Sequence, residues 1–431
     1  MLQHYSYIYS VPYLVYFFFL LLTMLKEFVY LNKRQEKKKL DLLVLGSLIV
    51  FFGLRGFVYT DWTLYYQFFL KLPILADWDY WTLDGIVFDC GYEKGFILYS
   101  ILIKSLFSNY FIWVFIGSLL DLIVIHKIIT KNTNYYILAV IMFILFGGLT
   151  IEFNLYRNSK AIICFLLSIN YLQKRKLIPY LLLNALGCYF HISALLYLPL
   201  YFILDRRINM KLIWTLFIIG NVIYLFQIPY LSKILLSVGS ILGGRINALI
   251  YFYMADSHFG VSAGITIGYI ERAISFILLA LYYQKSRNSF TQVYVNMFFI
   301  YVFIYLYCSE FSIITQRVPL LFVLSYTIIY PQIFACFTSL KTKRYFLVVF
   351  VLYSVLKLAE SNNEIFSRYD NLLFGIEKYA TGILSYIAVI IYYAMLRFDM
   401  MTYVPFLIVA LLIACMAIYV FEFPKCKTEQ V

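Results

Sequence analysis

Charged residues are scarce in this chain of 431 residues, because Asp, Glu, Lys and Arg together make up only 13% of it. Soluble domains carry about 25% of these residues. Hydrophobic residues make up 63% of the chain, in long apolar runs that follow one another almost without pause. This composition excludes a soluble protein and predicts an all-α polytopic integral membrane protein. We expect one transmembrane domain over residues 1–431 with roughly 12–14 transmembrane helices, re-entrant or half helices and an outward-facing polar cavity.

Motifs for nucleotides and metals are also missing. The sequence contains no Walker loop, GxGxxG, HExxH or GxSxG motif, so it offers no recognisable means of using ATP. Any reaction would therefore need an already activated substrate. The seven cysteines show no CxxC or Cys/His spacing, and most lie inside apolar runs, which favours packing over disulfides or metal ligation. We expect no metal, no cofactor and no nucleic-acid partner.

The apolar runs predict individual spans and two irregular segments. The segment 96–107 is too short to cross a membrane, so we expect a half helix there. The segment 177–204 is too long for one span, and we expect it to bend near His191. The other runs are the candidate spans, at 11–31, 40–59, 109–129, 135–150, 157–173, 209–228, 264–284, 291–308, 318–337, 345–359, 380–396 and 402–421.

Short basic turns determine the predicted orientation. Turns such as Lys33–Lys39, Lys174–Lys176 and Lys341–Arg344 should face the cytoplasm by the positive-inside rule. This bias accounts for most of the net charge of +13, and such turns also attract anionic membrane lipid. The opposite connections then face outward, and the larger extracytoplasmic loops are 60–95 and 229–263.

A small set of ionisable residues lies at or near the predicted outward ends of the apolar segments. A charge near lipid costs roughly 2.5–3.5 kcal/mol on insertion scales unless it faces a cavity or a partner. Such residues therefore indicate a site by default, and together they predict a cationic pocket that opens outward. The set consists of Arg55, Asp61, Glu93, Arg157, His191, Arg245 and Arg317.

The cationic members are candidates for binding an anion. Arg157 and Lys160 are three residues apart at the start of a predicted helix, where backbone N–H groups also favour anions. The alternative is a pair that extends along apolar surface towards water. Arg55 offers a planar fork of donors suited to phosphate, or an ion pair with Asp61 that anchors the interface. Arg245 and Arg317 are interface anchors singly, but several converging arginines would suit a diphosphate.

The acidic residues and the histidine admit two interpretations each. Glu93 begins the predicted half helix, where the helix dipole stabilises an acid, or it forms the floor of the pocket. Asp61 could orient a sugar hydroxyl or accept its proton. His191 could be a core residue, a general base or a phosphate ligand. Aromatic residues near these groups suit either a membrane interface or sugar stacking, namely Trp62, Tyr65, Tyr92 and Tyr251.

The order of these segments resembles the EpsG-like branch of bacterial Wzy-type polysaccharide polymerases, over roughly residues 40–340. The chain departs from that pattern at Ser159-Lys160, where Gln and an apolar residue are frequent, and at Ile192, where Pro is common. The residues that carry the resemblance are Arg55, Asp61 and Tyr65, then Gly91-Tyr92-Glu93 with Gly95, Arg157-Asn158-Ser159-Lys160-Ala161, His191-Ile192-Ser193-Ala194-Leu195, Arg245 with Tyr251, and Arg317.

The resemblance implies a multi-pass protein of the bacterial cytoplasmic membrane whose active site faces the exterior or periplasm, with an architecture like that of GT-C glycosyltransferases. Such proteins join oligosaccharide units carried on undecaprenyl diphosphate, which serves as both donor and acceptor. A flippase and a chain-length regulator are expected partners. The diphosphate would be held by cationic residues, namely Arg157, Lys160, Arg245, Arg317 and Arg55. The reaction would use His191, Asp61 and Glu93, whose roles the sequence does not separate. The glycan would contact Trp62, Tyr65, Tyr92 and Tyr251.

Two other classes of membrane protein are alternatives. An O-acyltransferase or O-antigen ligase would also act on glycans, but an acyltransferase would place its histidine near a cytoplasmic acyl-donor tunnel. A flippase for lipid-linked oligosaccharides would have pseudo-twofold halves around a cavity open to both faces. The sequence has no repeat between its halves and its singled-out charges lie at one predicted face, which favours the polymerase.

Overall fold

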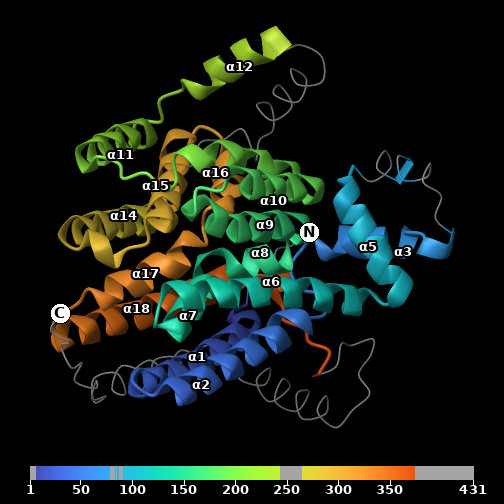
Figure 1. Ribbon diagram of the computed structural model, residues 1–431, viewed down its shortest axis with the longest axis horizontal. Coiled ribbons are helices and arrows are strands. Elements are labelled where there is room, and N and C mark those ends of the chain that lie inside the picture. The colour runs from blue at the N-terminus through green and yellow to red at the C-terminus, as the bar shows by residue number, and fades with distance from the viewer. Residues whose placement is uncertain (1–5, 78–82, 84, 87–90, 243–264, 374–431) are drawn as a thin grey trace. The chain divides into compact units, whose positions relative to one another are not determined.

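The computed structural model describes residues 6–77, 83, 85–86, 91–242 and 265–373 (Figure 1). Within these ranges the chain forms helices and no strand, which confirms the all-α prediction. One isolated antiparallel β-bridge joins Arg55 to Asn371. The chain divides into two compact units, Met1–Leu198 with Phe337–Val431 and Pro199–Cys336. That the chain acts as one transmembrane domain stays a prediction.

The first unit begins with two helices that lie side by side (Figure 1). Pro12 lies in the first helical turn of α1, where its missing N–H costs no hydrogen bond. The bounds are Tyr7–Ser10 for the 3-10 turn η1, Val11–Tyr30 for α1, Arg34–Leu48 for α2 and Ile49–Gly53 for the π-helical turn η2.

The next helices include the predicted half helix. The helix α5 is 13 residues long, too short to cross a bilayer, and Glu93 is its N-cap residue. Asn109 caps the long helix α6, because its side-chain oxygen accepts from the backbone N–H groups of Phe111 and Ile112. The bounds are Trp62–Lys71 for α3, Leu75–Asp77 for η3, Lys94–Leu106 for α5 and Tyr110–Asn132 for α6.

Two breaks interrupt the following helices. Gly147, at φ 108°, lies at a kink between α7 and α8 and adopts a conformation that favours glycine. His191 has extended backbone and separates α10 from η5, at the position of the predicted bend. The bounds are Tyr136–Phe143 for α7, Ile144–Gly148 for η4, Leu149–Phe153 for α8, Tyr156–Gln173 for α9, Leu177–Phe190 for α10 and Ile192–Phe202 for η5.

Late segments of the chain complete the first unit. The hydroxyl of Tyr13 on α1 donates to the backbone oxygen of Ser367 at 2.7 Å, so the late segments pack against the first helix. The bounds are Leu340–Ser361 for α18 and Ile365–Ser367 for η8.

The second unit has its own apolar core. Phe217 of α11 stacks on Phe276 of α14 with ring centroids 3.8 Å apart, and both rings are buried. The bounds are Met210–Leu225 for α11, Leu231–Leu242 for α12, Ile267–Lys285 for α14, Arg287–Ser289 for η6, Gln292–Tyr307 for α15, Ser312–Arg317 for α16, Pro319–Leu321 for η7 and Ser325–Ala335 for α17.

Several described helices are long and apolar enough to cross a membrane, so the protein is an integral membrane protein. Three helices meet this condition, Tyr7–Tyr30, Tyr110–Asn132 and Tyr136–Phe153. A fourth span would consist of Ile314–Leu321 and Ser325–Ala335, which are bent by 65°. The larger count of 12–14 spans and the re-entrant insertion stay predictions. The predicted spans 380–396 and 402–421 lie outside the described residues.

Candidate functional site

Three helix ends of the first unit meet around Arg157, at the start of α9. Its guanidinium Nη1 lies 2.7 Å from Oε2 of Glu93, the N-cap residue of α5. The guanidinium also lies over the ring of Tyr92, 4.2 Å from its centroid, and its Nε donates to the hydroxyl of Tyr65 at 3.4 Å. The predicted residues Arg157, Glu93, Tyr65 and Tyr92 are therefore brought together, and we call them the Arg157 junction.

The C-terminal end of α10 closes the junction on the side of Glu93. The second carboxylate oxygen of Glu93 accepts from the backbone N–H of Ile192 at 3.1 Å. Gly95 permits this close approach, since a Cβ at this position would lie 2.6 Å from the Cβ of Tyr189. Both oxygens of Glu93 are thus engaged, one by the arginine and one by the backbone that follows His191.

His191 belongs to a short hydrogen-bonded chain beside the junction. Its Nδ1 lies 2.8 Å from Oγ of Ser193, which is in turn 2.7 Å from Oδ1 of Asn158. The backbone N–H of Ser193 donates to the same Nδ1 at 3.2 Å. Ser193 therefore engages Nδ1 through both its hydroxyl and its backbone N–H.

Asp61 lies at the N-terminal end of α3 and is positioned by the segment that precedes α9. The backbone N–H groups of Thr60 and Asp61 donate to Oδ1 of Asn154 at 3.2 and 3.3 Å. Oδ1 of Asp61 accepts from the hydroxyl of Thr60 at 3.1 Å. No described residue engages its other carboxylate oxygen. Trp62, the next residue, packs on Phe57 with ring centroids 4.3 Å apart.

Tyr65 belongs to an aromatic cluster that packs against the other residues of the junction. Its ring packs on Tyr156 at 4.4 Å, and Tyr156 stacks on Trp113 at 5.5 Å between ring centroids. Burial raises the pKa of Tyr65 to about 12, so the phenol is neutral at physiological pH. Tyr65 is 6% exposed, which makes it part of the core and leaves Tyr92 as the more accessible ring of the junction.

Lys160 lies three residues further along α9 and contacts a different set of residues. Its ammonium lies 2.5 Å from Oδ2 of Asp121 on α6 and 2.8 Å from the backbone oxygen of Gly117. Its third contact is with Oγ of Ser159 at 3.4 Å. These three contacts use all three N–H groups of the ammonium. Lys160 and Arg157 therefore leave the same helix turn but bind different neighbours.

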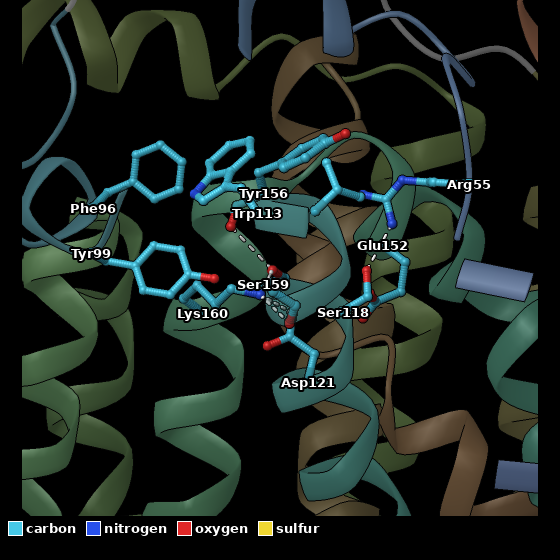
Figure 2. A pocket seen from close by; sticks show the side chains of 12 residues that line it. Arg55, Phe96, Tyr99, Trp113, Ser118, Asp121, Glu152, Tyr156, Ser159 and Lys160 are labelled. Carbon is cyan, nitrogen blue, oxygen red and sulfur yellow. Dashed lines mark hydrogen bonds and ion pairs between the residues drawn. The ribbon is translucent and has the colours of Figure 1, made fainter. Parts of the chain in front are cut away.

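Arg55 faces the same interior region as Lys160 (Figure 2). Its Nη1 donates to the backbone oxygen of Phe52 at 2.7 Å and to Oγ of Ser118 at 2.8 Å. Its guanidinium also lies over the rings of Phe153 and Tyr156, at 5.3 and 5.0 Å. Arg55 is only 2% exposed, and the alternative of an ion pair with Asp61 is not found among the described contacts.

Arg55 and Lys160 line one interior cavity, together with the acids Asp121 and Glu152 (Figure 2). The space open to water centres in it is about 20 Å³, enough for one water but far too small for a diphosphate. The cavity and the Arg157 junction are therefore distinct regions. The other residues that line the cavity are Phe96, Tyr99, Trp113, Val114, Gly117, Ser118, Tyr156 and Ser159.

The remaining predicted residues lie elsewhere. Arg317 is exposed at the end of α16 in the second unit. Arg245 and Tyr251 lie outside the described residues. The convergence of Arg157, Arg245 and Arg317 on one diphosphate stays a prediction. In the part of the chain that the structure describes, no three His, Cys, Asp or Glu side chains are grouped as metal ligands.

Sequence reasoning missed the two acids of the interior cavity. Asp121 lies in the middle of the predicted span 109–129, and an acid at that depth is by itself an indication of a partner or a cavity. Glu152 lies in the segment 151–157, which is predicted to face outward, and it is not among the site residues predicted from the sequence. Both are buried, at 1% and 3% exposed.

Comparison with known families gives a match to the family model described as EpsG family, over residues 38–371 of the chain. Comparison with curated proteins gives no match, and comparison with solved structures gives none either. The matched range contains both the Arg157 junction and the interior cavity, and it covers most of the chain. The protein is an integral membrane protein linked to exopolysaccharide biosynthesis, and it belongs to the EpsG family.

Proposed function

We propose that this protein is a polysaccharide polymerase, a glycosyltransferase that joins undecaprenyl-diphosphate-linked oligosaccharide units on the outer face of the bacterial cytoplasmic membrane. The observation that carries the proposal is the partly exposed guanidinium of Arg157 at the N-terminal end of α9, held by Glu93 and the ring of Tyr92. Membership of the EpsG family supports a role in making a polysaccharide.

Arg157 has the properties of a phosphate ligand. An arginine fork binds two phosphate oxygens at once, and the residue stands in the first turn of a helix of 18 residues, an end that favours anions. The arginine side chain is 21% exposed, so an anion can reach it. A diphosphate would take the place that the carboxylate of Glu93 occupies beside the guanidinium. Arg245 and Arg317 are further candidate ligands of the same diphosphate.

The proposed reaction is a single glycosyl transfer. A hydroxyl of the acceptor sugar attacks C1 of the donor sugar, and a new C1–O bond forms. The bond between C1 and the diphosphate oxygen breaks, and its electron pair stays on the diphosphate. Arg157 stabilises the negative charge that builds up there, an effect that is often the largest contribution to catalysis. The proton of the attacking hydroxyl passes to a base.

We assign the base to Asp61. Glu93 has both oxygens engaged, by Arg157 and by the N–H of Ile192. His191 has its Nδ1 engaged by Ser193, whereas Asp61 has one carboxylate oxygen without a contact among the described residues. Asp61→Asn should then abolish polymer, whereas Glu93→Gln should keep part of it. Equal losses in the two variants would contradict this assignment.

The experiment that tests the function is a glycan gel of the producing strain with the gene deleted and then restored. Surface polysaccharide that collapses to a single repeat unit, and that the intact gene restores, would support polymerisation. Long chains with an altered decoration would instead indicate an acyltransferase. Lipid-linked units that accumulate on the inner leaflet would indicate a flippase, and both of these results would overturn the proposal.

A further inference from the structure

The interior cavity beneath the first turn of α9 has no role in the proposed glycosyl transfer. It lies between α5, α6, α8 and α9, and Figure 2 shows its charged groups on opposite sides, Lys160 with Asp121 and Arg55 with Ser118 and Glu152. Asp121 and Glu152 are almost completely buried. Buried polar atoms nearly always have a hydrogen-bond partner, so each exception calls for an explanation.

Several polar atoms that line this cavity have no partner among the described residues. Two are acceptors, Oδ1 of Asp121 and Oε1 of Glu152. Three are donors, the hydroxyl of Tyr99, Nε1 of Trp113 and Nε of Arg55. An unpaired buried polar group is destabilising, so together these atoms would be a large penalty for one small region.

The charges exclude an ionic ligand. Two carboxylates and two cations line the cavity, so with all four groups ionised it is neutral. A further ion would leave an uncompensated charge in a buried place, which is strongly unfavourable. The ligand must also be small, because the space for water centres is about 20 Å³. A buried water needs roughly 10–15 Å³ of such space and makes two to four hydrogen bonds.

We propose that this cavity is a binding site for ordered water that bridges the carboxylates of Asp121 and Glu152. A water donates two hydrogen bonds, which the two unpaired carboxylate oxygens accept, and it accepts from unpaired donors on the opposite wall. The water joins Asp121 of α6 and Glu152 of α8 in one hydrated charge network with Lys160 and Arg55. That network supports the helix turn that carries Arg157, and it does not depend on polymerase activity.

Gly117 keeps the cavity open. A Cβ at this position would lie 3.2 Å from the hydroxyl of Tyr99 and 3.3 Å from the ammonium of Lys160, tighter than most such contacts. Gly117→Ala therefore reduces the space for water while it adds only one methyl group. Gly46 of α2 provides a matched control, because a Cβ there would meet no atom within 4 Å.

X-ray radiolytic labelling in water enriched in oxygen-18 tests the proposal on the full-length protein in lipid nanodiscs. Bound water produces hydroxyl radicals at its own position, so Tyr99 and Trp113 should be modified several times faster than Tyr197, which is fully buried and does not line the cavity. Labelling of Tyr99 and Trp113 should fall in Gly117→Ala but not in Gly46→Ala.

Two outcomes would overturn the water site. One is modification of Tyr99 and Trp113 as slow as that of Tyr197 in the unaltered protein. The other is fast labelling that is unchanged in Gly117→Ala, which would place the water elsewhere. The comparison within the unaltered protein stands by itself if Gly117→Ala does not accumulate in the membrane. Neither measurement uses polymer formation, so a failed polymerase proposal would leave the result intact.

Discussion

Two ion pairs leave the first turn of α9 three residues apart, and they differ in how much water reaches them. The side chains of Arg157 and Glu93 are 21% and 20% exposed, whereas those of Lys160 and Asp121 are 12% and 1% exposed. Both pairs are short, with N to O distances of 2.7 and 2.5 Å. The two pairs therefore do not differ clearly in their N to O distances, but they do differ in burial.

The difference in burial separates an exchangeable pair from a fixed one. A partly exposed ion pair contributes about 0–1 kcal/mol, so an anionic ligand can replace one partner at little cost. Breaking a buried pair costs about 3–5 kcal/mol, because the remaining charge has no access to water. One helix turn thus holds a cation that an anion can reach beside a cation that is paired in the packing of α6 against α9.

Removal of the buried acid should have the largest effect. Asp121→Asn leaves the ammonium of Lys160 without its counter-charge, and we expect the free energy of unfolding to fall by about 3–5 kcal/mol. Thermal unfolding of the purified protein in nanodiscs measures this. The double variant Asp121→Leu with Lys160→Met should recover part of the loss. A decrease no larger than that of Glu93→Gln would contradict the contrast between the two pairs.

Removal of the partly exposed cation should affect polymer formation and leave stability almost unchanged. Arg157→Ala should lower polymer formation by about 10²–10³-fold, the typical effect of losing one group that stabilises transition-state charge. Its free energy of unfolding should change by less than about 1 kcal/mol. A glycan gel with quantified membrane protein measures both. Arg157→Lys, which keeps the charge but loses the planar fork, should fall in between. Near-normal polymer from well-expressed Arg157→Ala would overturn the role of this residue.

The helices and their breaks could be predicted from the sequence because the information is local. The apolar run that ends near Lys131 predicts a span, and the structure has a helix at Tyr110–Asn132. The half helix at Lys94–Leu106 and the break at His191 follow from the length of apolar runs between polar residues. These features need no knowledge of which helices are neighbours.

The partners of the charged residues could not be predicted in the same way. Spacing places Arg157 and Lys160 on one face of a helix, which suggested a shared ligand. Their actual partners, Glu93 and Asp121, belong to α5 and α6, and only the packing of those helices against α9 decides which cation meets which acid. The interior position of Arg55 is likewise a result of tertiary packing.

Neutralising the partner of Arg157 should have an intermediate effect on polymer. Glu93→Gln keeps the shape of the side chain and an oxygen for the N–H of Ile192 but removes the charge beside the guanidinium. We expect polymer formation to fall by about tenfold, equivalent to roughly 1.4 kcal/mol, because Arg157 is positioned less well before the diphosphate takes the place of the carboxylate. A rate assay on membranes with lipid-linked substrate measures this. A loss as complete as that of Arg157→Ala would show that Glu93 acts in the reaction itself.

The smallest effect should come from Tyr65→Phe. The hydroxyl accepts from Nε of Arg157 at 3.4 Å, a long hydrogen bond, while the ring keeps its packing on Tyr156. We expect a loss of about twofold to threefold in polymer formation, from a contribution near the lower limit of about 0.5 kcal/mol.

The pH dependence of polymer formation by Tyr65→Phe separates a packing role of the Tyr65 phenol from a role in proton transfer. Burial raises the pKa of Tyr65 to about 12, above its value of about 10 in the unfolded chain. The stability that this group contributes is therefore present below about pH 10 and is lost as the pH rises towards 12. Between roughly pH 6 and 9 the phenol stays neutral, so Tyr65→Phe should leave the shape of the pH–rate profile unchanged. A shifted profile would mean that the phenol exchanges a proton during the reaction.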